Sequence, residues 1–210
     1  MDTRKEYMVN GPTNVLARAG AAGSRSRRAA ALRGSRAQRI DYVVGGCPEP
    51  AGAAGSLGVA LVARSERGVC AILVGADQAP LEAELARYFP HATLQEDGAA
   101  LGGLLADWWT FVAMPSSGFN HALDLAGTPL QQQVWEALRN IPIGSTLTYC
   151  DLAARVGRPD AVRAVASACA ANRLAVVIPC HRVIGRSGSL TGYRWGIDRK
   201  RRLLDMEARG

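Results

Sequence analysis

Residues 161–183 read AVRAVASACAANRLAVVIPCHRV, and this stretch decides the fold of the chain. It begins with a segment almost bare of large side chains, continues through an apolar run at residues 174–178, and places Cys180 directly before His181. An imidazole beside a thiol can draw off the thiol proton, which is what a sulfur nucleophile requires. Most single cysteines are nevertheless buried structural residues. The pair alone leaves three interpretations open: a nucleophile, a metal ligand and a core residue.

The surroundings of the cysteine favour a nucleophile. The apolar run predicts a buried strand that ends at Pro179, so Cys180 would lie at the end of a rigid element, where catalytic groups are common. Glu207 belongs to a helix predicted over residues 198–208 and could orient His181 as the third member of a thiol–imidazole–carboxylate relay. Taken alone, Glu207 also fits a solvated acid at a helix end.

Three further features carry side chains suited to chemistry. Tyr149 offers a phenol that could donate a proton or touch a phosphate, and Asn172 follows the segment of small residues. Residues 192–196 (GYRWG) form a glycine-flanked aromatic and cationic loop suited to stacking on a flat ring. The plainer alternatives are a half-buried core tyrosine, a turn-forming asparagine and a surface loop with its aromatic side chains turned inward.

The pattern of caps and turns predicts a helix-turn-helix. Thr128 and Pro129 are a good N-cap and first-turn proline for a leading helix. Thr148, with an acid three residues later, resembles a capping box and opens the next helix. A third helix is predicted over residues 160–171, and Arg163 is its only long cationic side chain. Such a slim helix could enter a groove of DNA or pack closely against a neighbouring helix.

The chain is predicted to divide into three parts. They are a disordered basic tail over residues 1–39, an N-terminal α/β domain over residues 40–122 with a small antiparallel sheet, and a mostly helical C-terminal domain over residues 123–210. The elements predicted before the helix-turn-helix are strands over residues 40–44, 57–63, 69–74 and 123–125, a loop over residues 47–55, and helices over residues 81–89 and 99–114.

Composition and charge narrow the class of protein. The chain is 48% hydrophobic and 20% charged, and no apolar run approaches the roughly 18 residues that span a bilayer. The five cysteines contain no CxxC pair, which argues against a disulfide framework or a structural zinc site and favours a reducing compartment. Net charge is +7 over residues 1–40, −7 over residues 41–149 and +7 over residues 150–210. The basic C-terminal segment suits a nucleic-acid partner, although a solvated face would look the same.

The first residues carry a separate question. Residues 8–39 contain no acid, as in an organelle transit peptide. Bias toward Ala, Arg and Gly is also common in high-GC bacterial genes, so we favour a basic tail, a remnant of a lost domain or a misassigned start codon.

Together these segments resemble the O6-alkylguanine-DNA alkyltransferases (methylated-DNA–protein-cysteine methyltransferases), most of all the C-terminal half of bacterial Ada proteins. The likeness runs from about residue 40 to the C-terminus. It is carried by residues 128–139 (TPLQQQVWEALR), 161–174 and 178–183, with support from residues 64–75 (RSERGVCAILVG) and 192–196. The resemblance implies a ribonuclease H-like N-terminal domain and a winged-helix-like C-terminal domain.

The resemblance also implies a function. The protein would repair double-stranded DNA by direct, irreversible transfer of a methyl or other alkyl group from O6 of guanine, or O4 of thymine, to Cys180, once per molecule. The damaged base would be rotated out of the duplex to reach the thiol. Neither a cofactor nor a metal is expected, because the DNA supplies the alkyl group. We expect a monomer in the bacterial cytoplasm, with no membrane partner.

Roles at the reacting centre follow from the same likeness. Cys180 would accept the alkyl group, and His181, oriented by Glu207, would draw off the thiol proton through a water. Asn172 would hold the turn before the active-site segment and hydrogen-bond near the cysteine. Tyr149 would help to rotate the nucleotide and donate a proton to the departing purine.

Other positions are implied to hold the base and the duplex. Backbone groups at Cys180 and Val183 would read the guanine edge, Tyr193 and Arg194 would form walls of the pocket, and Lys200 would support the loop that carries them. Arg163 would fill the gap left in the base stack. The remaining DNA contacts implied for its helix are Ala161, Ala164 and Ala166. The bulk of Arg194 and of the tryptophan after it suggests that large alkyl groups fit poorly.

Departures from the family pattern leave two alternatives. Leu130 stands where the family commonly has Phe, and PEPAGAAG after Cys47 resembles an insertion. The four-cysteine zinc module and second helix-turn-helix region of full-length Ada members are not found in these 210 residues. A truncated Ada-type DNA-binding regulator of the alkylation response is one alternative. The other is a cysteine hydrolase, which the adjacency of Cys180 and His181 and the missing oxyanion-hole glycine loop disfavour.

Overall fold

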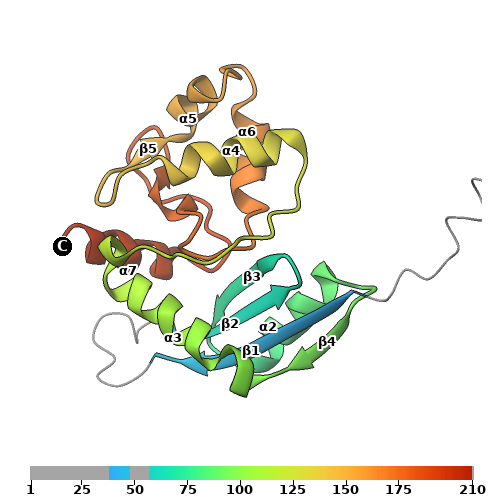
Figure 1. The fold of residues 1–210 in the computed structure, drawn as a ribbon. Helices are drawn as coiled ribbons and strands as arrows, with labels where there is room; N and C mark the ends of the chain where they lie inside the picture. The colour runs from blue at the N-terminus through green and yellow to red at the C-terminus, as the bar shows by residue number, and fades with distance from the viewer. Residues whose placement is uncertain (1–37, 48–56, 210) are drawn as a thin grey trace, which may run out of the picture. The chain divides into compact units, whose positions relative to one another are not determined.

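A four-stranded mixed sheet forms the first half of the fold (Figure 1). This computed structural model describes residues 38–47 and 57–209, so nearly all of the predicted basic tail and of the loop predicted over residues 47–55 lies outside the described residues. The strands are β1 (Arg39–Gly46), β2 (Val59–Ser65), β3 (Gly68–Gly75) and β4 (Thr93–Glu96), in the order β3-β2-β1-β4.

The prediction of an antiparallel sheet is wrong at one edge. β1, β2 and β3 pair antiparallel, as expected, but β4 lies parallel to β1. No strand was predicted over Thr93–Glu96, because this short edge strand is largely exposed and lacks alternating apolar residues. The parallel register, with Ile40 opposite Leu94, depends on the α2 crossover, and the local pattern does not encode it.

Two helices cover the sheet. α2 (Gln78–Tyr88) buries Leu81 and Leu85 and packs on β2 and β3, whereas α3 (Gly98–Ala113) packs on β1 and β2. Asp97 accepts a hydrogen bond from the amide of Ala100 and caps α3. The buried residues of α3 recur at helical spacing and include both tryptophans: Leu101, Leu104, Leu105, Trp108, Trp109 and Val112.

The second half of the fold is helical. Its elements are α4 (Pro129–Arg139), β5 (Leu147–Thr148), α5 (Tyr149–Arg155), α6 (Val162–Ala170), β6 (Val183–Ile184) and α7 (Ile197–Glu207). Thr128 and Gln131 form a reciprocal capping box on α4. The box predicted at Thr148 is only half formed, because the Asp151 carboxylate accepts from the Thr148 hydroxyl and not from its amide. α5 and α6 form the predicted helix-turn-helix, and α4, α5 and α6 cluster away from the sheet (Figure 1).

The segment before the cysteine follows the edge of β3, but it is not the predicted strand. Ile72 makes a single parallel bridge to Leu174, and the Trp108 indole donates to the carbonyl of Ala175 at 3.1 Å. Val176 then adopts a φ of 68°, which turns the chain away from extended conformation. The strand predicted over residues 123–125 is likewise reduced to one bridge, between Val69 and Leu123. Among the described residues, no helix combines the length and the apolar character needed to cross a bilayer.

Candidate active site

The cysteine begins a single turn of 3₁₀ helix, η3 (Cys180–Arg182), and is 6% exposed. The buried Asn172, two residues after the end of α6, organises the chain that leads to it. The Asn172 side-chain oxygen accepts from the amide of Leu174 at 2.8 Å, and its Nδ2 donates to the carbonyl of Ile178 at 2.9 Å. The same nitrogen lies 3.3 Å from the sulfur of Cys180. The side chain of Asn172 thus binds backbone groups that a neighbouring strand would otherwise bind, and it directs an N–H donor at the thiol.

Behind the cysteine lies a buried ionic cluster made of His181, Arg182 and Glu207. The Glu207 carboxylate, on α7, accepts from Nε2 of His181 at 2.8 Å. Arg182 binds the same carboxylate in a bidentate manner, with Nε to Oε2 at 2.9 Å and Nη2 to Oε1 at 2.8 Å, and donates through Nη1 to the carbonyl of Ile141. The side chains of the three residues are at most 7% exposed. Glu207 therefore contacts His181, the partner predicted for it. Arg182 also belongs to this ionic cluster, and it was not predicted from the sequence.

The cluster sets the protonation state of the histidine. Burial alone raises the pKa of Glu207, but hydrogen bonds from His181 and Arg182 outweigh it and lower that pKa to about 2. An ionised Glu207 can only accept, so the proton of the imidazole lies on Nε2. Burial lowers the pKa of His181, and the ring is neutral at pH 7. Its Nδ1 is buried without a hydrogen-bond partner in the described part of the chain, and so presents a free lone pair.

The thiol is protonated in the resting protein. Burial raises the pKa of Cys180, and the opposing influences of Asn172 and of the Lys200 ammonium are smaller. The resting pair is therefore a thiol and a neutral imidazole, and it becomes reactive only when the proton moves. Cys169 has a pKa raised to about 12 by burial and by the neighbouring Cys180. The cavity thus contains two thiols, of which only that of Cys180 has a side-chain amide at its sulfur.

Cys180 opens onto a mostly apolar cavity of about 310 Å³. This volume lies at the lower end of the roughly 300–1,000 Å³ typical of small-molecule pockets. The Tyr149 hydroxyl donates to the carbonyls of Thr191 and Gly192, at 3.4 Å in each case. The other lining residues come from α6 and from the loop before α7: Ala166, Cys169, Ala170, Gly192, Tyr193 and Arg194. The first three of these repeat at helical spacing, which is the signal that could have revealed Cys169 in the sequence.

The last helix supports the cavity loop. The Lys200 ammonium donates to the carbonyl of Val183 and, at 3.0 Å, to that of Thr191. Val183 itself is fully buried, and its side chain does not line the cavity. Trp195 is 5% exposed and also lies outside the lining, with its ring 5.3 Å from that of Tyr193. Among the aromatic and cationic residues of this loop, Tyr193 and Arg194 are the two that form the walls.

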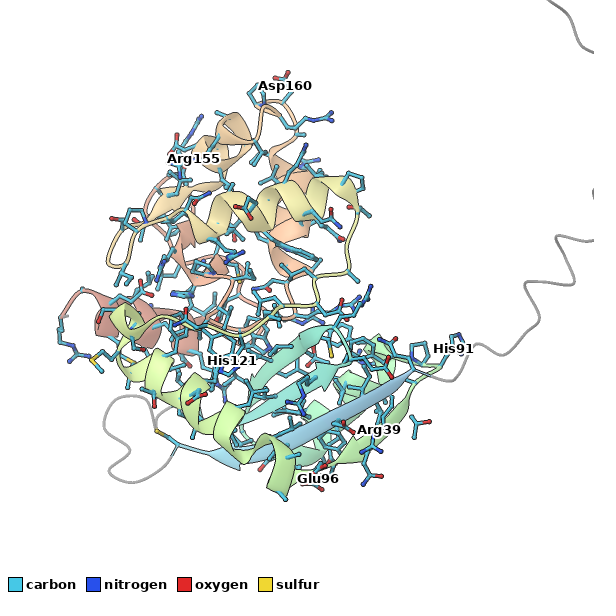
Figure 2. All side chains as sticks on the ribbon, viewed as in Figure 1. Arg39, His91, Glu96, His121, Arg155 and Asp160 are labelled. Carbon is cyan, nitrogen blue, oxygen red and sulfur yellow. The ribbon has the colours of Figure 1, made fainter. Side chains whose placement is uncertain are left out.

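The exposed face of α6 is small and carries one cation. Ala164 and Ser167 are exposed, and Val165 and Ala168 hold the opposite face in the core. The Arg163 guanidinium is exposed and makes no hydrogen bond or ion pair within the described residues. Ala161 and Ala166 are partly buried at the two margins of this face. Figure 2 places Arg155 and Asp160, which flank the turn before α6, at the end of the helical half remote from the sheet.

The structure therefore brings one group of predicted residues to the thiol and leaves the other on the surface. Cys180, Asn172, Tyr149, Tyr193 and Arg194 contact or line the cavity. His181 and Glu207 lie directly behind it, and Lys200 and Val183 support it. Ala161, Arg163 and Ala164 lie on the neighbouring face of α6. In the described part of the chain, no group of three or more His, Cys, Asp or Glu side chains could hold a metal ion.

Known proteins match this chain in sequence and in fold. The family model for the 6-O-methylguanine DNA methyltransferase DNA-binding domain matches residues 129–209. The bifunctional transcriptional activator/DNA repair enzyme Ada of Escherichia coli is 50% identical over 152 residues, which are 72% of this chain and 43% of Ada. The chain thus spans less than half the length of that relative.

Two further relatives are matched over most of their length. The inducible methylated-DNA–protein-cysteine methyltransferase of Bacillus subtilis is 42% identical over 141 residues, which are 66% of this chain and 79% of the relative. The crystal structure of Mycobacterium tuberculosis OGT in complex with DNA has a TM-score of 0.64 and 33% identity, and the match covers 80% of this chain and 93% of that one. With this sequence identity and this shared fold, the chain belongs to the methylated-DNA–protein-cysteine methyltransferase family.

Proposed function

We propose that this protein repairs double-stranded DNA by moving a methyl or other alkyl group from O6 of guanine, or from O4 of thymine, onto the sulfur of Cys180. The observation that carries the proposal is the Cys180 thiol at the wall of a mostly apolar cavity, with Asn172 at its sulfur and the hydrogen-bonded His181–Glu207 pair next to it in the chain fold. The matched Bacillus subtilis relative bears the name of this activity, and the matched Mycobacterium tuberculosis structure contains DNA. Because a thioether is not readily cleaved, each molecule would act once.

Proton transfer would precede displacement. The free lone pair on Nδ1 of His181 is suited to receive the thiol proton through a water, and Glu207 would stabilise the imidazolium that results. Asn172 and the Lys200 ammonium would stabilise the thiolate. The S–C bond would then form as the C–O6 bond breaks. Burial raises the pKa of Tyr149 to about 12, so its phenol stays protonated and is able to donate to the departing guanine.

The alkyl group must leave the base stack before the thiol can reach it. Extruding a base from the duplex costs a few kcal/mol, and a weakened pair lowers that cost. The small side chains of Ala164, on the exposed face of α6, and of Ala161 and Ala166, at its margins, would allow close approach to a groove of DNA. The exposed guanidinium of Arg163 would occupy the gap in the stack. In the cavity, backbone groups at Cys180 and Val183 would read the guanine edge between walls formed by Tyr193 and Arg194, with Lys200 supporting the loop.

The finer architecture belongs to the same proposal. We propose a ribonuclease H-like domain over residues 40–122 and a winged-helix-like DNA-binding alkyltransferase domain over residues 123–210. The α5–α6 helix-turn-helix and the small β5–β6 pair support the second description. We also propose that the protein acts as a monomer in the bacterial cytoplasm, where the chromosome lies.

Mass spectrometry tests the transfer directly. Wild-type protein is incubated with a duplex that contains one O6-methylguanine, and its peptides are weighed. We expect a gain of one methyl mass on the peptide that carries Cys180, and no such gain in Cys180→Ala. Peptide resolution matters because Cys169 lines the same cavity. Binding to the lesion without any mass gain on Cys180 would contradict the proposal and indicate a DNA-binding regulator.

The role of Arg163 has its own test. Arg163→Ala should slow transfer from the duplex much more than transfer from free O6-methylguanine, because only the duplex requires extrusion. Arg201→Ala is the matched control, since it removes the same charge from an exposed position on α7. Equal losses on both substrates would argue against insertion into the base stack.

A further inference from the structure

An ion pair joins the sheet half of the molecule to the wall of the cavity. Arg194 donates through Nε to Oε1 of Glu84, on α2, at 2.8 Å. Its Nη1 donates to the carbonyl of Ala170, at the end of α6, also at 2.8 Å. One guanidinium therefore connects α2, the end of α6 and the loop that forms the cavity wall. Glu84 and Arg194 are 110 positions apart in the chain.

Neighbouring residues hold the carboxylate in place. The Tyr88 hydroxyl, one helical turn after Glu84, donates to the same carboxylate oxygen at 2.8 Å. The guanidinium carbon of Arg194 lies 5.0 Å from the centroid of the Tyr88 ring, and that of Arg173 lies 4.5 Å from it. Side-chain exposure is 16% for Glu84 and 28% for Arg194. This pair is thus shielded and braced, unlike the freely solvated ion pairs that add little to stability.

The contact decides where a bulky side chain lies beside the reacting sulfur. Arg194 and Cys180 line the same cavity. An arginine side chain has many rotamers, and a guanidinium beside an apolar surface needs a compensating charge. Glu84 supplies that charge from outside the helical half. Without Glu84, the guanidinium would keep only the bond to the carbonyl of Ala170 and the contact with the ring of Tyr88, so the side chain would leave the cavity wall more often.

We infer that Glu84, braced by Tyr88, is a positioning residue that holds Arg194 as a closed wall of the alkyl pocket and thereby restricts the size of the group transferred. The inference rests on the proposed transfer to Cys180. It assigns to α2, in the sheet half, control over the substrate range of a site built by the helical half.

Competing substrates of different size test this positioning role. The second-order rate constants for modification of Cys180 are measured with free O6-methylguanine and free O6-benzylguanine, so that DNA binding does not enter. In Glu84→Gln we expect the benzyl-to-methyl ratio to rise about tenfold, which corresponds to about 1.4 kcal/mol in relative barrier height. Tyr88→Phe keeps the ring, loses the brace and should raise the ratio about threefold.

Glu82→Gln is the matched control. Glu82 lies on the same helix and accepts from Tyr42 and Gln78, with no bond to the loop before α7. The benzyl-to-methyl ratio of Glu82→Gln should stay at the wild-type value. If Glu84 acts through Arg194, Arg194→Ala should raise the ratio by itself, and adding Glu84→Gln to that variant should change nothing further. Thermal midpoints of all variants separate this effect from a loss of folding.

Several results would overturn the inference. Methyl and benzyl rates that fall by the same factor in Glu84→Gln would indicate a merely structural pair. The inference would also fail if adding Glu84→Gln to Arg194→Ala changed the benzyl-to-methyl ratio further. It would fail as well if Glu82→Gln raised this ratio as much as Glu84→Gln does. If Glu84→Gln is unfolded, the benzyl-to-methyl ratios of Tyr88→Phe and Arg194→Ala test the inference instead, and wild-type ratios in both variants would overturn it. Failure of the wild type to gain a methyl group on Cys180 would instead remove the proposed function itself, so the two failures are distinct.

Discussion

Replacing Glu207 with glutamine leaves the guanidinium of Arg182 buried without its carboxylate. In the wild type, that carboxylate accepts hydrogen bonds from Arg182, from His181 and from the backbone amide of Gly144, and its side chain is 2% exposed. A glutamine side chain has nearly the same shape, so packing is conserved, but the negative charge and one of the two acceptor oxygens are lost. The expected effect is therefore electrostatic and should depend on pH.

The size of the effect follows from the pKa. Burial opposes ionisation of Glu207, but bonds from His181 and Arg182 lower its pKa from 4.5 to about 2. At about 1.4 kcal/mol per pH unit, this difference corresponds to roughly 3 kcal/mol of folding free energy. Breaking a buried ion pair by removing one partner costs about 3–5 kcal/mol, which agrees. Because the folded-state pKa lies below the unfolded value, the contribution is complete above about pH 4.5 and disappears as the pH falls through about 2.

Urea unfolding at a series of pH values measures this contribution. We expect Glu207→Gln to lower the free energy of unfolding by about 3 kcal/mol at pH 7, and the difference from wild type to shrink below about pH 4.5. Asp205→Asn, which changes an exposed acid of the same helix, should cost less than about 0.5 kcal/mol. If Glu207→Gln proves unfolded, the double variant Arg182→Met/Glu207→Leu should regain stability, because it leaves no unpaired charge. A loss below about 1 kcal/mol, or a difference that does not vary with pH, would refute the reasoning.

Three further outcomes are expected. Asn172→Leu should lower the free energy of unfolding by roughly 2–3 kcal/mol, because the buried backbone groups of Leu174 and Ile178 lose their hydrogen-bond partner. The same change should slow methylation of Cys180, and normal methylation kinetics would exclude the contact with the thiol from catalysis. Burial lowers the pKa of His181 below its usual 6.5, so the acid decline of the methylation rate should be centred below pH 6.5; a decline centred at or above pH 6.5 would contradict the lowered pKa. Trp135→Phe removes the 2.9 Å bond from the indole to the carbonyl of Ala168 and should cost about 1 kcal/mol in urea unfolding, with unchanged methylation; a variant as stable as wild type would show that the bond contributes nothing.

Local sequence patterns predicted those parts of the fold that depend on interactions between residues close together in the chain. Thr128 and Pro129 begin α4 as expected, because a cap and a first-turn proline act within one helical turn. The period of apolar residues located α2, α3 and the strands β1, β2 and β3 to within a few residues. The same logic failed over residues 174–178, where an apolar run predicted a strand. The Asn172 side chain binds that backbone, and Val176 turns it.

The sequence by itself determined which groups we propose to react, since the adjacency of Cys180 and His181 is covalent and their chemistry belongs to the side chains. Which groups they meet was decided only by the tertiary structure. Arg182 shares Glu207 with the histidine across 25 positions, and Glu84 reaches Arg194 across 110. The strength of these pairs depends on burial and on distances of about 3 Å, which are set when the whole chain folds and cannot be read from spacing along the chain.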